Sequence, residues 1–420
     1  KCHRHFHRWQ VTFMKATVGG ITAPKGFRAA GLSAGIKPNG SMDMSLLVSE
    51  VPAVCAAAFT TNMVKSAAVL RNIEILKKEK SVNAVITNSG NANACTGEQG
   101  KKSNLVMAEE AASVLGVDPD TVLTASTGVI GVQPPVDKYR SGARSLASIL
   151  GSDPAHAEDA ACGILTTDTH PKYCAVEFDI SGTTVTIGGM AKGTGMICPN
   201  MATMLAFVTT DCAITKTLLN KALSSTIKTT YNMVSVDGDT STNDSAFLLA
   251  NGKAANPVIN AEGKDYDTFV KALYKVNEYL AKELVRDGEG ATKFIEAEVI
   301  KAENEDKASK IAKSIIKSSL LKAAIFGSDA NWGRVLCAMG YSGESFDPEK
   351  VDVIFKSIGG ELTVLKGGVP AGFQESETLK VLGADEIHII ASLNEGNASG
   401  RAWGCDLTYE YVKINGEYRS

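Results

Sequence analysis

Short apolar runs alternate along the chain with longer stretches whose apolar residues recur at helical spacing. Apolar runs of four to eight residues predict buried strands, and apolar positions three and four residues apart predict helices. The predicted strands cover residues 46–50, 53–59, 82–87, 122–127, 201–208, 295–300, 351–355, 362–364 and 387–391. The predicted helices cover residues 64–80, 101–115, 136–150, 156–164, 215–230, 265–284 and 306–319. Strands and helices intermix throughout, which predicts an α/β or α+β layered body.

Two glycine-containing segments add detail to this layout. Residues 175–180 and 183–188 alternate in polarity around Ser181-Gly182, which predicts a β-hairpin. Residues 394–406 are rich in glycine and predict a turn region near the end of the chain. The hairpin leads directly to Lys192 and the segment KGTGMICPNMATMLAFVTTD, residues 192–211.

Thr203 stands where the polar part of this segment becomes apolar, directly after the small residue Ala202. A β-branched Thr suits the start of a strand for packing reasons alone. A hydroxyl next to an uncrowded carbonyl also allows attack on the preceding peptide bond, which leaves a new chain that begins with Thr. Such a residue carries nucleophile and base together, because its own α-amine accepts the hydroxyl proton. The spacing alone leaves both interpretations open.

The segment KGTGMICPNMATMLAF resembles the self-cleavage segment of the glutamate N-acetyltransferase (ornithine acetyltransferase) family of arginine biosynthesis, and the resemblance extends from about Gly19 to Ser420. It implies that the protein cuts its own Ala202–Thr203 bond and assembles as an (αβ)2 heterotetramer. It implies a leader or tail, an α chain and a β chain over residues 1–18, 19–202 and 203–420. The implied fold is the αββα-type sandwich of the self-processing N-terminal-nucleophile enzymes.

The resemblance also assigns roles that the residue pattern leaves open. Thr203 is then the catalytic nucleophile, and Thr127 with the Gly128 N–H matches the oxyanion hole, although the residues alone favour an ordinary strand end there. Glu289 lies in the family-like stretch GEGATKF, and its carboxylate suits a substrate that carries an ammonium group. The substrate-binding positions implied by the resemblance are Thr166, Lys192, Thr203, Glu289, Asn415 and Ser420.

The implied reaction moves an acetyl group from N-acetylornithine to glutamate through an acetyl-Thr203 intermediate, in ping-pong order. These small molecules are the expected partners, and no metal or organic cofactor is expected. Acetyl-CoA is a co-substrate if the enzyme also acetylates glutamate from it. One alternative is a self-cleaving Thr amidase or aminopeptidase, in which water discharges the acyl-enzyme. A second alternative is an uncleaved binding protein, which predicts no effect of Thr203→Ala on function.

Three polar segments allow other chemistry. Asp168 and His170 stand two residues apart, as an acid–base pair would, but Pro171 favours a turn. The Asp and Asn residues of 234–244 lack the EF-hand spacing, so we expect a self-hydrogen-bonded loop that faces the site instead of a metal site. Residues 88–97 contain three Asn and two Gly, which predicts left-handed backbone in a loop. The family resemblance implies that this loop lies near the site.

Composition narrows the partners and the compartment. The formal net charge of -3 disfavours the basic face typical of nucleic-acid-binding proteins. No apolar run reaches the roughly 18 residues of a membrane span. Nine cysteines without CxxC or Cys/His metal spacing indicate reduced thiols. We therefore expect a cytoplasmic protein without nucleic-acid or membrane partners. A basic remnant of a plastid or mitochondrial-matrix transit peptide at residues 1–18 is the alternative.

Overall fold

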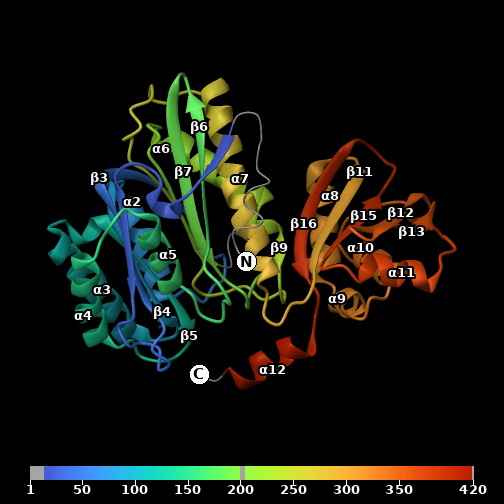
Figure 1. Cartoon of the computed structure of the whole chain (residues 1–420), viewed down its shortest axis with the longest axis horizontal. Helices are drawn as coiled ribbons and strands as arrows, with labels where there is room; N and C mark the ends of the chain where they lie inside the picture. The colour runs from blue at the N-terminus through green and yellow to red at the C-terminus, as the bar shows by residue number, and fades with distance from the viewer. Residues whose placement is uncertain (1–13, 199–203, 419–420) are drawn as a thin grey trace.

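The computed structural model describes residues 14–198 and 204–418. A nine-stranded network and a smaller seven-stranded sheet form its two parts, and the long helix α7 lies between them (Figure 1). Most of the predicted leader, the Ala202–Thr203 bond and Ser420 lie outside the described residues, so what the sequence predicts for them stays a prediction. Within the described ranges, no helix combines the length and the hydrophobicity that crossing a membrane requires.

The larger network contains strands from both sides of the predicted cleavage point. Its order is β1-β6-β7-β8-β10-β3-β4-β5, with β2 paired to β3. The strands are β1 (Met14–Thr17), β2 (Phe27–Leu32), β3 (Met44–Phe59), β4 (Val82–Asn91), β5 (Val122–Val129), β6 (Lys172–Ile180), β7 (Thr183–Lys192), β8 (Leu205–Thr210) and β10 (Ser245–Ala250). The first half of β3 pairs with β2 and β4, and its second half pairs with β10. One long strand therefore belongs to both halves of the network.

These two halves stack face to face and carry helices on their outer faces. Phe207 of β8 and Val85 of β4 belong to one shared inner core. Their neighbours Val208 and Ile86 point outward into two further cores, the first with α6 and α7 and the second with α3 and α4. Because strand side chains alternate between faces, each layer is buried on both sides, which explains the unbroken apolar runs. The resulting helix–sheet–sheet–helix order confirms the predicted αββα sandwich.

The helices of this part are α2 (Ala67–Lys77), α3 (Gly97–Leu115), α4 (Val136–Ser148), α5 (Pro154–Gly163), α6 (Lys216–Thr229) and α7 (Lys264–Arg286). Each was predicted from its apolar spacing, with ends that differ by a few residues. The predicted hairpin is likewise present as β6 and β7, which pair antiparallel along their whole length.

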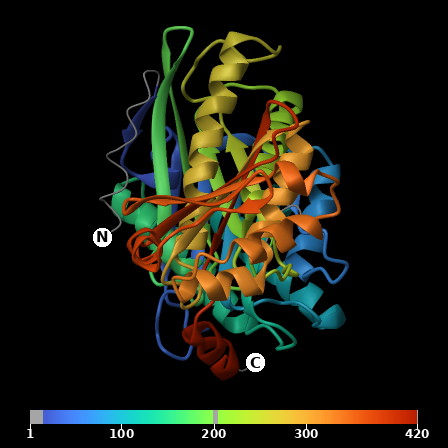
Figure 2. The same ribbon diagram turned by 90° about the vertical axis from the view of Figure 1, so that its right-hand side faces the viewer.

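All strands of the second sheet follow residue 203 in the sequence. The sheet has the order β14-β13-β12-β15-β11-β16-β9. Its strands are β9 (Val234–Ser235), β11 (Phe294–Ala302), β12 (Asp352–Ser357), β13 (Gly360–Lys366), β14 (Val369–Pro370), β15 (Glu386–Ser392) and β16 (Ala398–Cys405). The associated helices are α8 (Glu305–Lys317), α9 (Ser319–Phe326), α10 (Trp332–Gly340), α11 (Glu375–Leu382) and α12 (Tyr409–Glu417). Figure 2 shows this part in front of the larger network.

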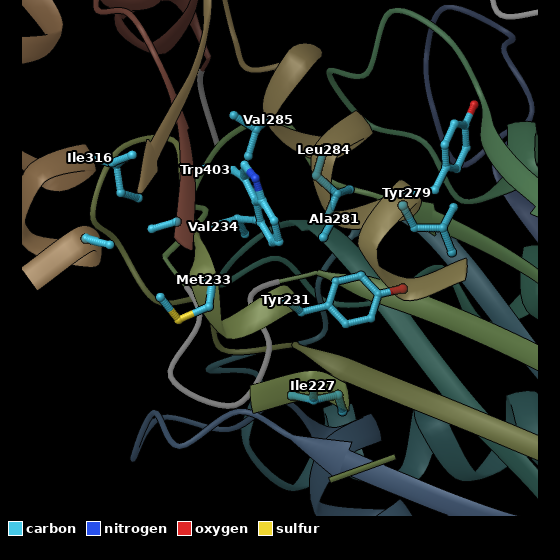
Figure 3. Close-up of a cluster of buried hydrophobic side chains, with 14 of the residues drawn as sticks. Ile227, Tyr231, Met233, Val234, Tyr279, Ala281, Leu284, Val285, Ile316 and Trp403 are labelled. Carbon is cyan, nitrogen blue, oxygen red and sulfur yellow. The ribbon is translucent and has the colours of Figure 1, made fainter. Parts of the chain in front are cut away.

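A buried hydrophobic cluster joins the two parts (Figure 3). Trp403 of β16 is only 1% exposed and shares this core with Val234 of β9, Leu284 of α7 and Ile316 of α8. Its indole N–H donates to a Glu296 carboxylate oxygen at 2.9 Å, so burial leaves no unpaired donor. Deleting a buried Trp side chain costs about 3–5 kcal/mol. The cluster therefore fixes the second sheet against α7, whose C-terminal end leads into the candidate site.

Two sequence predictions were wrong, and several short helices were not predicted. The strands predicted at 46–50 and 53–59 are the single strand β3, because the chain passes Pro52 with a register shift instead of a turn. The turn region predicted at 394–406 contains β16. A Cβ at Gly400 would lie 2.5 Å from the Ser309 nitrogen of α8, so this glycine permits close helix packing. Helices α9, α10, α11 and α12 were not predicted, since each is too short to show a clear period.

Candidate active site

A cavity of about 140 Å³ lies where β5, β7 and β8 meet the segment after α7 and the C-terminal helix α12. In Figure 1, α12 lies below both parts of the molecule. Six of the predicted site residues line this cavity: Thr127, Gly128, Thr166, Lys192, Glu289 and Asn415. Ala202, Thr203 and Ser420 lie outside the described residues. Met204, the next residue of the chain after Thr203, lines the same cavity.

Lys192, the last residue of β7, places a buried cation in the cavity wall. Its Nζ donates to Thr166 Oγ1 at 2.8 Å and to Thr127 Oγ1 at 3.2 Å. Burial lowers the pKa of Lys192, and the charge of Asp168 opposes this effect. An ammonium group has three N–H donors, so two hydroxyl partners leave one donor for a carboxylate or an oxyanion.

Gly128 lies inside β5, which continues past the predicted strand end to Val129. Its φ is +128°, and a Cβ there would lie 2.4 Å from the carbonyl carbon of Gly90 on the paired strand β4. Only glycine fits this close approach. The neighbouring Thr127 hydroxyl accepts from Lys192, which leaves its own proton free to donate. Thr127 and Gly128 both line the cavity, where the resemblance predicts the oxyanion hole.

The Glu289 carboxylate supplies the opposite charge in the cavity lining. One oxygen accepts from Thr167 Oγ1 at 2.7 Å, and the other accepts from Asn415 Nδ2 of α12 at 2.8 Å. Thr167 Oγ1 also lies 2.7 Å from Thr194 Oγ1. A Cβ at Gly195 would come within 2.3 Å of the carboxylate, so a glycine makes room for it. A cation and a carboxylate in one cavity are complementary to an amino acid that carries both charges.

Asp168 does not line the cavity but accepts hydrogen bonds from the N–H groups of Thr166 and Gly193, which do, and the sequence analysis missed these contacts. Segment 165–171 is a turn, as Pro171 predicted, and His170 lies 3.5 Å from Asp287 instead of pairing with Asp168. Asp168 is fully buried and pairs with Lys172 at 2.7 Å. Although burial raises the pKa of Asp168, the charges of Lys172 and Lys192 hold it well below its ordinary value. The only indication of this ion pair in the sequence is that Lys172 follows Asp168 by four residues.

The loop between β9 and β10 is self-hydrogen-bonded and lines the cavity, as predicted. The Asp237 carboxylate accepts from the N–H groups of Met196 at 2.6 Å and Ile197 at 2.9 Å. The Asn243 amide donates to the carbonyl oxygen of Ser126 at 2.8 Å, which ties the loop to β5. Among the described residues, no cluster of three or more His, Cys, Asp or Glu side chains has a metal-binding arrangement.

The predicted left-handed backbone in residues 88–97 is confirmed. Asn93 and Cys95 have positive φ angles of 49° and 59°, and Asn91 still belongs to β4. Ala92 lines the cavity, so this loop does border the site.

Comparisons with known proteins point to one family. The ArgJ family model matches residues 28–420. The arginine biosynthesis bifunctional protein ArgJ 1 of Clostridium acetobutylicum is 50% identical over 401 residues, which cover 95% of this chain and 97% of that protein. The protein ArgJ of Bacillus subtilis is 46% identical over 402 residues, or 96% of this chain and 97% of that protein. The solved ArgJ structure from Bacillus halodurans has 48% identity and a TM-score of 0.49, and it covers 51% of this chain and 100% of that chain.

Proposed function

This chain belongs to the ArgJ family and is an acetyltransferase of arginine biosynthesis, and we propose that it moves the acetyl group of N-acetylornithine to glutamate with Thr203 as nucleophile. One observation carries the proposal. A single cavity combines the buried Lys192 ammonium, the Thr127 and Thr166 hydroxyls and the Glu289 carboxylate. This combination offers a counter-charge to each end of an amino-acid substrate and a donor pair for a reacting carbonyl.

Self-cleavage of the Ala202–Thr203 bond creates the nucleophile and its base in one step. Support comes from both flanks of the bond. Upstream, Asp237 holds the backbone of Met196 and Ile197, and downstream Met204 lines the cavity. The α-amine released on Thr203 then accepts the hydroxyl proton as that oxygen attacks the acetyl carbonyl.

The acetyl carbonyl becomes an oxyanion, which the Gly128 N–H and the Thr127 hydroxyl stabilise. Collapse of the intermediate breaks the amide bond, and the proton held by the Thr203 amine passes to the leaving ornithine amine. The neutral amine of glutamate then attacks the acetyl-Thr203 ester, the Thr203 α-amine takes up its proton and returns it to the departing Thr203 oxygen, and N-acetylglutamate leaves. This order gives ping-pong kinetics.

Substrate charges are held by Lys192 and Glu289. Lys192 pairs with the substrate α-carboxylate, helped by Thr166. Glu289 suits the side-chain ammonium of N-acetylornithine, and it is held in place by Asn415 at 2.8 Å. Ser420 completes the binding set. No metal or organic cofactor takes part, and acetyl-CoA serves as a co-substrate only if the protein also acetylates glutamate from it.

The cleaved α chain (19–202) and β chain (203–420) pair into an (αβ)2 heterotetramer in this proposal, and the compartment is the cytoplasm. Strands from both segments share one network, which supports their remaining together after cleavage. The cysteines of the described ranges are all free, as is typical of a reducing compartment. A plastid or mitochondrial-matrix location through residues 1–18 is the alternative.

Intact-mass measurement of the purified protein tests this proposal directly. The wild type is expected to give two fragments that meet at Ala202/Thr203, whereas Thr203→Ala stays a single inactive chain. Thr203→Ser is the matched control, because it keeps a hydroxyl nucleophile and should still cleave. An uncut wild-type chain that transfers acetyl groups would refute the mechanism. Release of acetate without N-acetylglutamate would identify the amidase alternative.

A further inference from the structure

We infer that Asp168, which has no role in the mechanism above, is a positioning residue that fixes Lys192 and Thr166 for binding the substrate carboxylate. This inference rests on the proposed function, in which Lys192 pairs with that carboxylate.

The hydrogen bonds of Asp168 reach both segments that carry these binding groups. Its Oδ1 accepts from the N–H of Gly193, the residue after Lys192, at 2.8 Å. Its Oδ2 accepts from the N–H of Thr166 itself at 3.0 Å. The side chains of Lys192 and Thr166 meet 2.8 Å apart. One buried carboxylate therefore holds the backbone on each side of this contact, so the end of β7 and the turn at Thr166 cannot move independently.

Asp168 also acts on the charge of Lys192. Burial lowers the pKa of Lys192, and Asp168 is the strongest of the groups that oppose this effect. The charged groups that face Lys192 from the surrounding elements are Asp168, Lys172, Glu289, Asp244 and Lys37. Lys172 acts in the opposite direction from Asp168, because a second cation disfavours the protonated form of Lys192.

The second buried carboxylate beside Lys172, that of Asp287, allows an experiment to distinguish a positioning role of Asp168 from a merely structural one. Lys172 pairs with Asp168 at 2.7 Å and with Asp287 at 2.5 Å, and the two carboxylates are 0% and 3% exposed. Asp287 also accepts from the N–H of Thr169 at 3.0 Å, but it bonds to neither Thr166 nor Gly193. Asp287→Asn therefore disturbs the same lysine without touching the binding groups, which makes it the matched control for Asp168→Asn.

The experiment compares steady-state acetyl transfer in the wild type, Asp168→Asn and Asp287→Asn as a function of pH, with self-cleavage followed by mass. Asp168→Asn is expected to raise KM for N-acetylornithine at least about tenfold, because a buried charge-assisted contact is lost. Its kcat changes much less. The loss of kcat/KM at high pH, which reports deprotonation of Lys192, moves to lower pH. Asp287→Asn is expected to leave both KM and this pH limb near the wild-type values.

For a further variant, we expect the high-pH limb of kcat/KM to shift in the opposite direction. Lys172→Gln removes the neighbouring cation, keeps Asp168 bonded to Thr166 and Gly193, and is expected to move the high-pH limb upward. Equal KM increases in Asp168→Asn and Asp287→Asn, or no limb shift in either direction, would overturn the inference, as would failure of all three variants to give folded, cleaved protein. A wild type without acetyl transfer is a different result, because it removes the proposed function itself.

Discussion

Replacement of Gly128 by alanine tests the oxyanion site most sharply. The added Cβ would lie 2.4 Å from the carbonyl carbon of Gly90 and 2.6 Å from the nitrogen of Asn91. Both are backbone atoms of β4, which pairs with β5 at this point, so no side chain can move aside. A residue other than glycine held at this φ costs about 1–3 kcal/mol. Relief of the collision must therefore shift the Gly128 backbone relative to β4 and, in the proposed mechanism, move its N–H away from the oxyanion.

Loss of one oxyanion donor lowers kcat by about 10²–10³-fold, or roughly 3–4 kcal/mol of transition-state stabilisation. The assay is steady-state acetyl transfer by Gly128→Ala, with thermal unfolding as a check on folding. KM should change little, because the donor acts on charge that develops only in the transition state. Gly131→Ala is the matched control: Gly131 also has a positive φ, +83°, but no heavy atom lies within 4 Å of its added Cβ. A kcat for Gly128→Ala within about threefold of wild type, or an equal loss in Gly131→Ala, would refute the reasoning.

Three further predictions concern charged residues. Lys192→Met removes the cavity cation and should raise KM for both substrates at least about tenfold in steady-state kinetics; an unchanged KM would exclude carboxylate binding by Lys192. Asp237→Asn weakens the hold on the segment before the cleavage point, so intact mass over time should show slower self-cleavage, whereas cleavage at the wild-type rate would contradict this. Although burial raises the pKa of Asp168, Lys172 and Lys192 hold it below the unfolded value, so its stabilising contribution is present at neutral pH and is lost as pH falls below about 4. The gap between the urea midpoints of wild type and Asp168→Asn should therefore stay constant from pH 7 to about pH 5 and narrow progressively as the pH falls below about 4, and a constant gap down to pH 2 would contradict the assignment.

The layered fold was predictable because its strands are buried on both faces. Phe207 and Val208 point to opposite cores, and both are apolar, so the run around them is recognisable without knowledge of its partners. Gly400 shows the limit of such inference. Its neighbourhood has the composition of a turn, yet the glycine serves the close approach of α8 to β16, a contact between elements that local sequence does not reveal.

The site was predictable only through family resemblance. Thr127, Thr166, Lys192 and Glu289 come from four separate segments, two of them outside the strands, and only the tertiary fold brings them together. Periodicity and spacing carry no information about such long-range contacts. The partner that gives Asp168 its role is a backbone N–H 25 residues away, so the residue types around Asp168 could not indicate it.

The place of β8 in the network has a consequence for how the molecule reaches and keeps its folded state. β8 lies between β7, which precedes the predicted cut, and β10, which follows it, and β10 in turn pairs with β3. Cleavage then creates a new chain terminus without releasing either chain, because strands of the two chains alternate within one network. Before the cut, folding is a reaction within one chain; after it, unfolded halves must find each other, and recovery depends on their concentration. We therefore expect the stability of the cleaved protein to depend mainly on a slow rate of unfolding, because its refolding is no longer unimolecular.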